Sequence, residues 1–296
     1  MTDGVDPYRY GPPEPPATSN PTGKQVVSAS WRLLREDRQL LWLPAISTVT
    51  GLLAAAAFFV PGYLLGDAVV GHRRAGVYVG AAFAGFALSV ISIFFQSALV
   101  IGAFERAAGR RPTLGGVLSA AWDRKGQILA WAVVTSTVGA VIRAVEQRLG
   151  IVGKLLGFLG GITWAIATFL AVPVLIAERT GPIESVKRSS ELIRQTWGTS
   201  LRTTLRVGIG ATLVSIPLLV VGIVGAAVAE AGSLPLGIVL IVLGFGSFVA
   251  LLSVIGAITT YARALIYRYA TQQPVPGIPT AFFAGTFVPK RRRFRR

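Results

Sequence analysis

The chain has 296 residues, of which 52% are hydrophobic and only 14% are charged. Soluble domains contain about 25% charged residues, so the composition excludes an ordinary water-soluble protein. The sequence has no cysteine, which excludes disulfides, and a single histidine, which excludes an ordinary zinc site. The net charge of +16 would suggest nucleic acid in a soluble protein, but in a membrane protein Lys and Arg set the orientation instead.

Residues 1–25 form the first segment, which is rich in Pro, Gly and small polar residues and has no apolar period. This composition predicts a disordered tail. No apolar core follows the N-terminus directly, so the segment is not expected to be a signal peptide.

Six uncharged stretches follow, and each predicts a transmembrane helix. They cover residues 40–65, 75–104, 126–142, 155–177, 207–229 and 231–262. About 20 apolar residues cross the hydrocarbon core of a bilayer, and only the third stretch is shorter. Arg143 and Arg148 follow it and can extend it by snorkelling. Backbone polar groups cannot stay unpaired in lipid, so these stretches are expected to be helices, with kinks at Pro173 and Pro217.

The Lys and Arg residues between the spans are distributed unevenly. The N-terminal segment, the second and fourth connections and the C-terminal segment hold 24 of them, and the other three connections hold 5. The positive-inside rule therefore predicts a multi-pass protein of the plasma membrane with cytoplasmic N- and C-termini.

Each odd-numbered span is preceded by a segment with an apolar face and flanking cations, at residues 26–41, 112–125 and 182–197. Such segments are typical of amphipathic helices at a membrane surface, with ordinary packing on protein as the alternative. We therefore predict an all-α fold over residues 26–270. In it, six transmembrane helices form three hairpins, each preceded by a cytoplasmic amphipathic interfacial helix. A quasi-threefold axis along the membrane normal would relate the three units.

The predicted spans contain polar and small residues but no ionisable residue in their middle, which counts against proton-coupled or ion-coupled transport. The polar residues are Gln96, Ser47, Thr48, Thr50, Thr135, Ser136, Thr137, Thr163, Thr168, Thr259 and Thr260. Close helix packing with interhelical hydrogen bonds explains these residues without a ligand. The alternative interpretation is that they line a solvated cavity.

Two local contacts are also predicted. We expect Gly160 and Gly161 at a close helix crossing, because neither has a side chain to separate two backbones. Arg143 and Glu146 lie three residues apart, which favours a local ion pair. No catalytic, cofactor-binding or metal-binding residue is predicted, and the chain is not expected to be an enzyme.

The C-terminal segment, residues 271–296, ends in a dense cluster of positive charge. Its cations are Lys290, Arg291, Arg292, Arg293, Arg295 and Arg296. Each Lys or Arg near an anionic leaflet contributes about 1 kcal/mol of attraction, so the cluster predicts a contact with anionic headgroups at the cytoplasmic face. Nucleic acid is not expected as a partner, and the sequence leaves protein partners and the oligomeric state open.

Several short segments resemble an uncharacterised family of bacterial and archaeal six-helix membrane proteins, a domain of unknown function. These segments are Trp31-Arg32-Leu33-Leu34, Pro112-Thr113-Leu114, Val172-Pro173-Val174 and Gly181-Pro182-Ile183-Glu184-Ser185-Val186-Lys187-Arg188-Ser189. The resemblance implies no activity, substrate or site. The layout is also distantly similar to the membrane domain attached to some glycerophosphodiester phosphodiesterases, whose catalytic domain has no counterpart in this sequence.

These observations favour a non-enzymatic membrane protein that organises or assists lipids or partner proteins. The alternative is a transporter or channel for a small, largely neutral solute. A continuous polar cavity that reaches the middle of the membrane would favour transport, whereas a dry helix interior would favour the organising function.

Overall fold

In a computed structural model of the protein, the structure describes residues 23–70, 73–196 and 201–273. All regular elements within these ranges are helices, as the sequence predicts. The long helices are α2 (Trp42–Val70), α3 (Arg73–Ala107), α5 (Lys125–Arg148), α6 (Gly150–Ala167), α9 (Leu201–Glu230) and α10 (Leu234–Ala270). The shorter ones are α1 (Gly23–Glu36), the 3-10 turn η1 (Arg38–Leu41), α4 (Leu114–Trp122), α7 (Ala171–Glu178) and α8 (Pro182–Thr196).

Five helical segments of the described chain are long and apolar enough to cross a membrane. They are Arg38–Gly66, Arg74–Ala107, Lys125–Arg148, Gly150–Glu178 and Leu234–Ala270. The remaining predicted span lies in α9, where the described apolar part, Ser215–Glu230, is shorter. The described part of the chain is therefore all-helical, with several helices of the length and composition found in membrane proteins.

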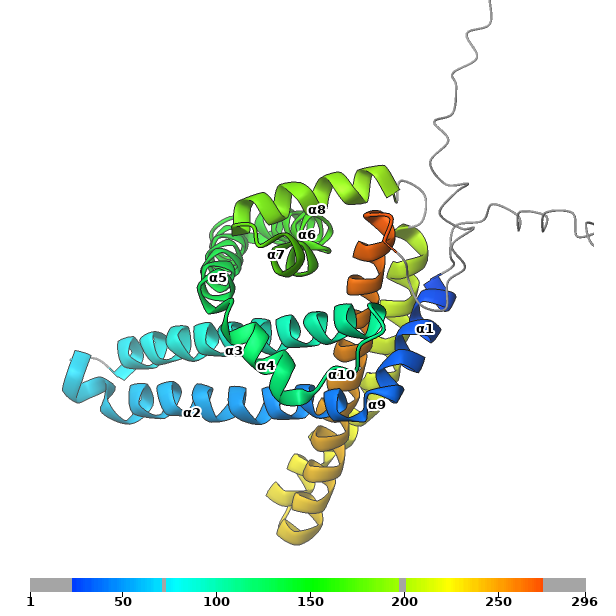
Figure 1. The fold of residues 1–296 in the computed structure, drawn as a ribbon. Helices are drawn as coiled ribbons and strands as arrows, with labels where there is room; N and C mark the ends of the chain where they lie inside the picture. Colours follow the sequence, from blue (N-terminus) through cyan, green and yellow to red (C-terminus); the bar gives the residue numbers. More distant parts are fainter. Residues whose placement is uncertain (1–22, 71–72, 197–200, 274–296) are drawn as a thin grey trace, which may run out of the picture.

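The long helices pack in three pairs, α2 with α3, α5 with α6 and α9 with α10. In Figure 1 the pairs run in different directions away from a shared region. A Cβ added to Gly80 of α3 would lie only 3.1 Å from the Cα of Gly62 in α2. Gly222 and Gly244 make a similar close approach between α9 and α10. Glycine allows these contacts because no side chain separates the two backbones.

Gly160 and Gly161 do not lie at a close crossing, so that prediction is wrong. A Cβ at either position would meet nothing within 4 Å. The stacked rings of Trp131 in α5 and Trp164 in α6, whose centroids are 6.2 Å apart, hold the two helices apart near these glycines. The two backbones approach closely at Gly153 instead, where a Cβ would collide with the carbonyl oxygen of Val145.

The predicted ion pair between Arg143 and Glu146 is also wrong, because it is not among the ion pairs of the described residues. The Glu146 side chain lies against Gly157 of α6, where a Cβ would collide with it. Arg143 is exposed. The carboxylate therefore turns towards the neighbouring helix and away from its predicted partner.

Buried side chains collect at the end of the long helices that adjoins α1, α4 and α8. They include Leu34, Leu40, Leu43, Ala98, Val100, Val117, Ile128, Leu175, Tyr261 and Leu265. The opposite ends expose large apolar side chains such as Leu64, Ile151 and Leu234. Extended apolar surface of this kind marks contact with a membrane or a partner. The three pairs thus share one core near the short helices.

The short helices α1, α4 and α8 occupy the segments in which the sequence predicts amphipathic helices. The Thr113 side chain caps α4 by accepting a hydrogen bond from the Gly116 backbone N–H at 3.2 Å. Helix α8 lies across α6 and α7 (Figure 1). Its buried face contains Ser185, Ser189 and Leu192, whereas the apolar side chain of Ile183 is exposed. The two serines are small, which lets α8 lie close to the helices that it covers.

The predicted fourth span is interrupted near Pro173, as expected. The break falls between α6 and α7, so Pro173 lies in the first turn of α7, where its missing N–H removes no helical hydrogen bond. At the break, the Ser189 hydroxyl of α8 accepts a hydrogen bond of 3.0 Å from the backbone N–H of Leu170. Helix α8 therefore satisfies a donor that the break leaves without a partner in its own helix.

Candidate functional site

A groove with a volume of about 360 Å³ opens between α2, α3 and α10. Its lining residues are Pro44, Ser47, Thr48, Ser92, Phe95, Gln96, Leu99, Val249, Leu252, Ser253, Gly256, Ala257 and Thr260. The polar groups in this lining are five hydroxyls and one carboxamide, and every lining residue is uncharged. The groove thus combines an apolar wall with neutral hydrogen-bonding groups.

Hydroxyl groups connect two walls of the groove. The hydroxyl oxygens of Thr48 in α2 and Ser253 in α10 lie 3.3 Å apart. Thr48 also donates to the carbonyl oxygen of Pro44 at 2.9 Å, and Thr260 donates to that of Gly256 at 2.8 Å. A hydroxyl that donates keeps lone pairs for accepting, so these oxygens can still accept hydrogen bonds from a ligand.

The third wall of the groove is a face of α3 that carries Ser92 and Gln96. The two residues are four positions apart, so they share one side of the helix. A carboxamide both donates and accepts hydrogen bonds. The groove can therefore offer both kinds of hydrogen bond to an uncharged ligand.

The groove ends at a layer of buried side chains. Leu40, Leu43 and Tyr261 have no exposed surface. A Cβ added to Gly102 of α3 would lie 3.6 Å from the Tyr261 hydroxyl oxygen, so this ring reaches across to α3. That hydroxyl is buried and lacks a hydrogen-bond partner among the described residues. The layer separates the groove from the end of the molecule that carries α1.

Behind this layer, Arg106 of α3 forms an ion pair with Asp37, the residue before η1. Its Nε donates to Asp37 Oδ2 at 2.7 Å and its Nη2 donates to Oδ1, so the contact is bidentate. Only 5% of the Asp37 side chain and 19% of the Arg106 side chain are exposed. Glu36 adds a looser contact with Arg106 at 3.8 Å. The pair fixes the N-terminal helix to α3.

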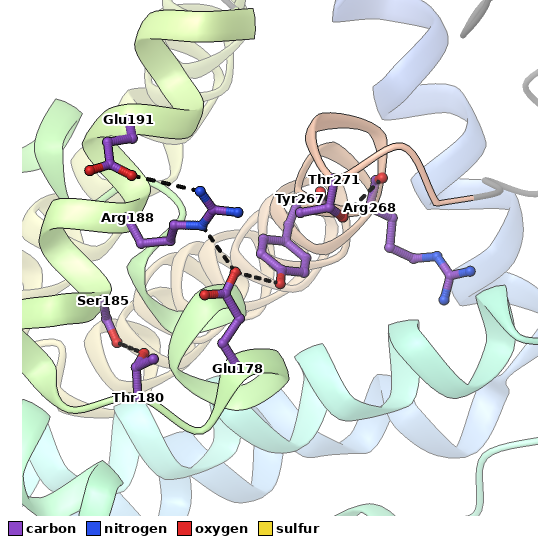
Figure 2. A network of polar contacts seen from close by, with 8 residues as sticks. All are labelled: Glu178, Thr180, Ser185, Arg188, Glu191, Tyr267, Arg268 and Thr271. Carbon is purple, nitrogen blue, oxygen red and sulfur yellow. Dashed lines mark hydrogen bonds and ion pairs between the residues drawn. The ribbon is translucent and has the colours of Figure 1, made fainter.

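A second polar network joins α7, α8 and α10 (Figure 2). Glu178 at the end of α7 accepts hydrogen bonds from the Tyr267 hydroxyl at 3.0 Å and from Arg188 Nε at 3.3 Å. Arg188 also lies 3.6 Å from Glu191 on the same helix. Figure 2 shows the Arg268 side chain turned away from Glu178. Because its charged groups contact one another, this network serves to hold three helices together.

The lining groups of the groove are suited to binding. Its serine hydroxyls have no histidine, carboxylate or amine beside them in the lining that would act as a general base. Within the described parts of the chain, no group of three or more His, Cys, Asp or Glu side chains is arranged to hold a metal ion. The arrangement suits an uncharged molecule with an apolar body and a few polar atoms.

Several of the polar residues singled out from the sequence come together in the groove. Ser47, Thr48, Gln96 and Thr260 meet there from three helices. Sequence reasoning did not identify Ser92 and Ser253, although the spacing of Ser92 from Gln96 was an available signal. The predicted lipid-contact residues of the C-terminal cluster lie outside the described residues; they are Lys290, Arg291, Arg292, Arg293, Arg295 and Arg296.

A model of a family of unknown function, DUF6159, matches residues 75–276. The chain belongs to this family. The DUF6159 match begins within the first turn of α3 and includes the rest of α3 and all of α10, which form two walls of the groove. It agrees with the resemblance to a domain of unknown function noted from the sequence. No curated protein and no solved structure matches the chain.

Proposed function

We propose that this chain is a non-enzymatic, multi-pass protein of the plasma membrane that binds lipid or a partner protein within the bilayer. Six helices cross the bilayer as three hairpins, built on the pairs described above. Helix α9 has 30 residues, about 45 Å at 1.5 Å per residue, which is long enough for a crossing. The packing of the long helices in pairs supports the three hairpins, and the arrangement requires the pairs to lie more nearly parallel in the bilayer than they do in Figure 1.

The proposed orientation has both termini in the cytoplasm of a bacterial or archaeal cell. Of the 29 Lys and Arg residues, 24 then face inward, in line with the positive-inside rule. Helices α1, α4 and α8 lie at the inner surface. The Arg35 guanidinium carbon lies 5.6 Å from the centre of the Trp31 ring, and Lys125 Nζ lies 5.0 Å from the centre of the Trp122 ring. Tryptophan beside a cation suits the headgroup region, which supports this placement.

The groove between α2, α3 and α10 carries the proposal. Gln96 precedes Arg106 by ten residues, so it lies about 15 Å further into the bilayer than this charged group. Phospholipid headgroups do not lie at that depth, whereas the hydroxyl and ester groups of a neutral lipid can follow its chains into a groove. The buried layer of Leu40 and Tyr261 closes the inner end, which favours holding a lipid over conducting a solute.

The test is photocrosslinking in proteoliposomes with a diacylglycerol whose acyl chain carries a photoreactive group. We expect labelled peptides from α2, α3 and α10 near the groove. The Gln96→Leu variant should be labelled less, because it removes the carboxamide without removing bulk. Thr137→Val is the matched control, since this α5 hydroxyl lies outside the groove and donates to the Val133 carbonyl oxygen at 2.8 Å.

Two outcomes would contradict the proposal. One is labelling spread evenly over all exposed helix ends, and the other is groove labelling that Gln96→Leu leaves unchanged. A phosphatidylcholine with the same photoreactive chain serves as the control probe. We expect it to label lipid-exposed helix surfaces without preference for the groove.

Transport of a small neutral solute is the second candidate, and the hydroxyl-rich lining of the groove favours it. In this case, the protein should accelerate glycerol entry into proteoliposomes, followed by light scattering. The Gln96→Leu variant should slow this entry and Thr137→Val should not. Entry at the rate of protein-free liposomes would remove this candidate and leave the lipid-binding function.

A further inference from the structure

Arg263 on α10 is a largely buried cation without an anionic partner in the described structure. Its guanidinium carbon lies 5.1 Å from the centre of the Phe169 ring, in the turn between α6 and α7. Its Nε is buried and has no hydrogen-bond partner. None of the ion pairs among the described residues involves Arg263. The residue keeps partial exposure, so part of the side chain reaches the surface.

Of the helices that pack on α10, neither α7 nor α9 has a free carboxylate to offer. Glu178 of the adjoining α7 already accepts hydrogen bonds from Tyr267 and Arg188. Helix α9 packs along α10 but contains no Asp or Glu before Glu230, at its far end. A charge that compensates the guanidinium must therefore come from outside these elements.

Two other buried polar atoms lack a hydrogen-bond partner among the described residues, the Tyr261 hydroxyl and Arg124 Nε. A tyrosine hydroxyl needs no counter-ion. Arg124 donates from Nη1 to the Ala120 carbonyl oxygen at 2.6 Å and has Asp123 beside it in the sequence. Burial and the nearby Arg179 lower the pKa of the Arg124 guanidinium, and Asp123 acts in the opposite direction. Arg263 is thus the buried cation that the described chain compensates least.

The position of Arg263 along α10 sets its depth. Leu234 begins this helix, and Arg263 follows it by 29 residues, which is about 44 Å at 1.5 Å per residue. A bilayer with its headgroup regions is about 40–45 Å thick. When the Leu234 end lies at one surface, Arg263 therefore lies among the headgroups of the other surface. Helix α8 packs on this end of α10, where Leu192 joins a buried cluster with Ala262 and Ile266.

We propose that Arg263, held against Phe169, binds the phosphate of an anionic phospholipid in the inner leaflet. A guanidinium stacked on an aromatic ring keeps its N–H donors in its own plane, where two of them can bind two oxygens of one phosphate. A buried guanidinium without a counter-charge is unfavourable, and a bound phosphate removes that cost. The lipid chains then extend along α10 into the bilayer.

This lipid site shares with the proposed function only the premise that the chain lies in a bilayer. The groove binds an uncharged group, whereas Arg263 binds an anion on the other side of the layer that contains Tyr261. Each site can therefore fail its own test without affecting the other. The basic C-terminal cluster is a third, separate contribution that the experiment below keeps constant in all variants.

The test uses the full chain in detergent and measures phosphatidylglycerol binding by native mass spectrometry and by the rise in melting temperature. Arg263→Gln should weaken this binding about tenfold or more, because it removes a charge-assisted hydrogen-bonding pair. Arg263→Lys should give an intermediate affinity, since it keeps the charge and loses the bidentate geometry. Arg143→Gln, an exposed arginine at the far end of α5, should bind like the wild type.

The controls separate the sources of phosphate. Phosphatidylcholine should give a smaller rise in melting temperature than phosphatidylglycerol, and inorganic phosphate should give none. Equal rises with inorganic phosphate and phosphatidylglycerol would overturn the lipid as the ligand. Unchanged phosphatidylglycerol affinity in Arg263→Gln would overturn the site. If that variant does not fold, Phe169→Leu decides: weaker binding supports the proposal and unchanged binding overturns it.

Discussion

Two tyrosines of α10 differ in what their hydroxyl groups contact, and this difference predicts opposite effects of the same substitution. The Tyr261 hydroxyl is buried without a hydrogen-bond partner among the described residues, so Tyr261→Phe should leave the free energy of unfolding unchanged or raise it by up to about 1 kcal/mol. The Tyr267 hydroxyl donates to Glu178 at 3.0 Å, so Tyr267→Phe should lower it by about 1.5 kcal/mol or more. Unfolding in mixed detergent measures both values. Equal losses would contradict the contacts described for the two rings.

The two acidic residues beside Arg106 also differ in burial, and we expect them to contribute differently to the free energy of unfolding. Asp37→Asn should lower the free energy of unfolding by about 1.5–3 kcal/mol, because it weakens a bidentate contact and leaves Arg106 without its main counter-charge. Glu36→Gln is the control: its side chain is 51% exposed and its contact is 3.8 Å long, so the loss should stay below about 0.5 kcal/mol. The same unfolding measurement serves both variants, and a larger loss for Glu36→Gln would refute this ranking.

Between elements, glycines at helix crossings are expected to behave unlike glycines that face open space. A Cβ on Gly76 of α3 would lie 2.7 Å from the carbonyl oxygen of Gly62 in α2, so Gly76→Ala should force the helices apart and cost about 1–3 kcal/mol. Gly160→Ala should instead stabilise the protein by up to about 1 kcal/mol, because its Cβ meets nothing within 4 Å and alanine favours the helix. Melting temperatures in detergent should move in opposite directions, and a shared direction would contradict the described packing.

The contrast between these glycines shows how far sequence reasoning reaches. Uncharged stretches of sufficient length predict the helices themselves, and Pro173 predicts the break in the fourth stretch, because both features depend on local chemistry. The pairing face of a helix depends on its partner. The stacked rings of Trp131 and Trp164 lie between α5 and α6, so Gly160 and Gly161 do not lie at a helix crossing.

The groove illustrates the same limit for the candidate site. The sequence identifies Gln96, Thr48 and Thr260 as polar residues within apolar stretches, but it cannot state that they face one another. Their meeting requires the mutual arrangement of α2, α3 and α10, which contacts between distant segments determine. The Arg263 environment is also a tertiary feature, because Phe169 stands far from it in the chain.

For the whole molecule, the proposed orientation makes a direct prediction. The sequence contains no cysteine, so a single introduced cysteine reports on one position. Cysteine at Ser233, between α9 and α10, should react with an impermeant thiol reagent added outside intact cells. Cysteines at Thr113 and Ser190 should react only after the cells are opened. The reverse labelling pattern would mean that the molecule has the opposite orientation in the membrane and that the proposed phosphate site lies in the outer leaflet.

The break between α6 and α7 has a consequence for the order of events during synthesis. The Leu170 N–H bonds to Ser189, which the ribosome adds 19 residues later. Until α8 emerges and docks, this donor has no partner from the chain, and an unpaired backbone group in lipid costs several kcal/mol. In the proposed topology, the predicted fourth span can therefore enter the membrane early but reaches its final shape only after α8 has been translated. The hydrogen bonding at the break is therefore completed late, because it depends on the synthesis and docking of α8.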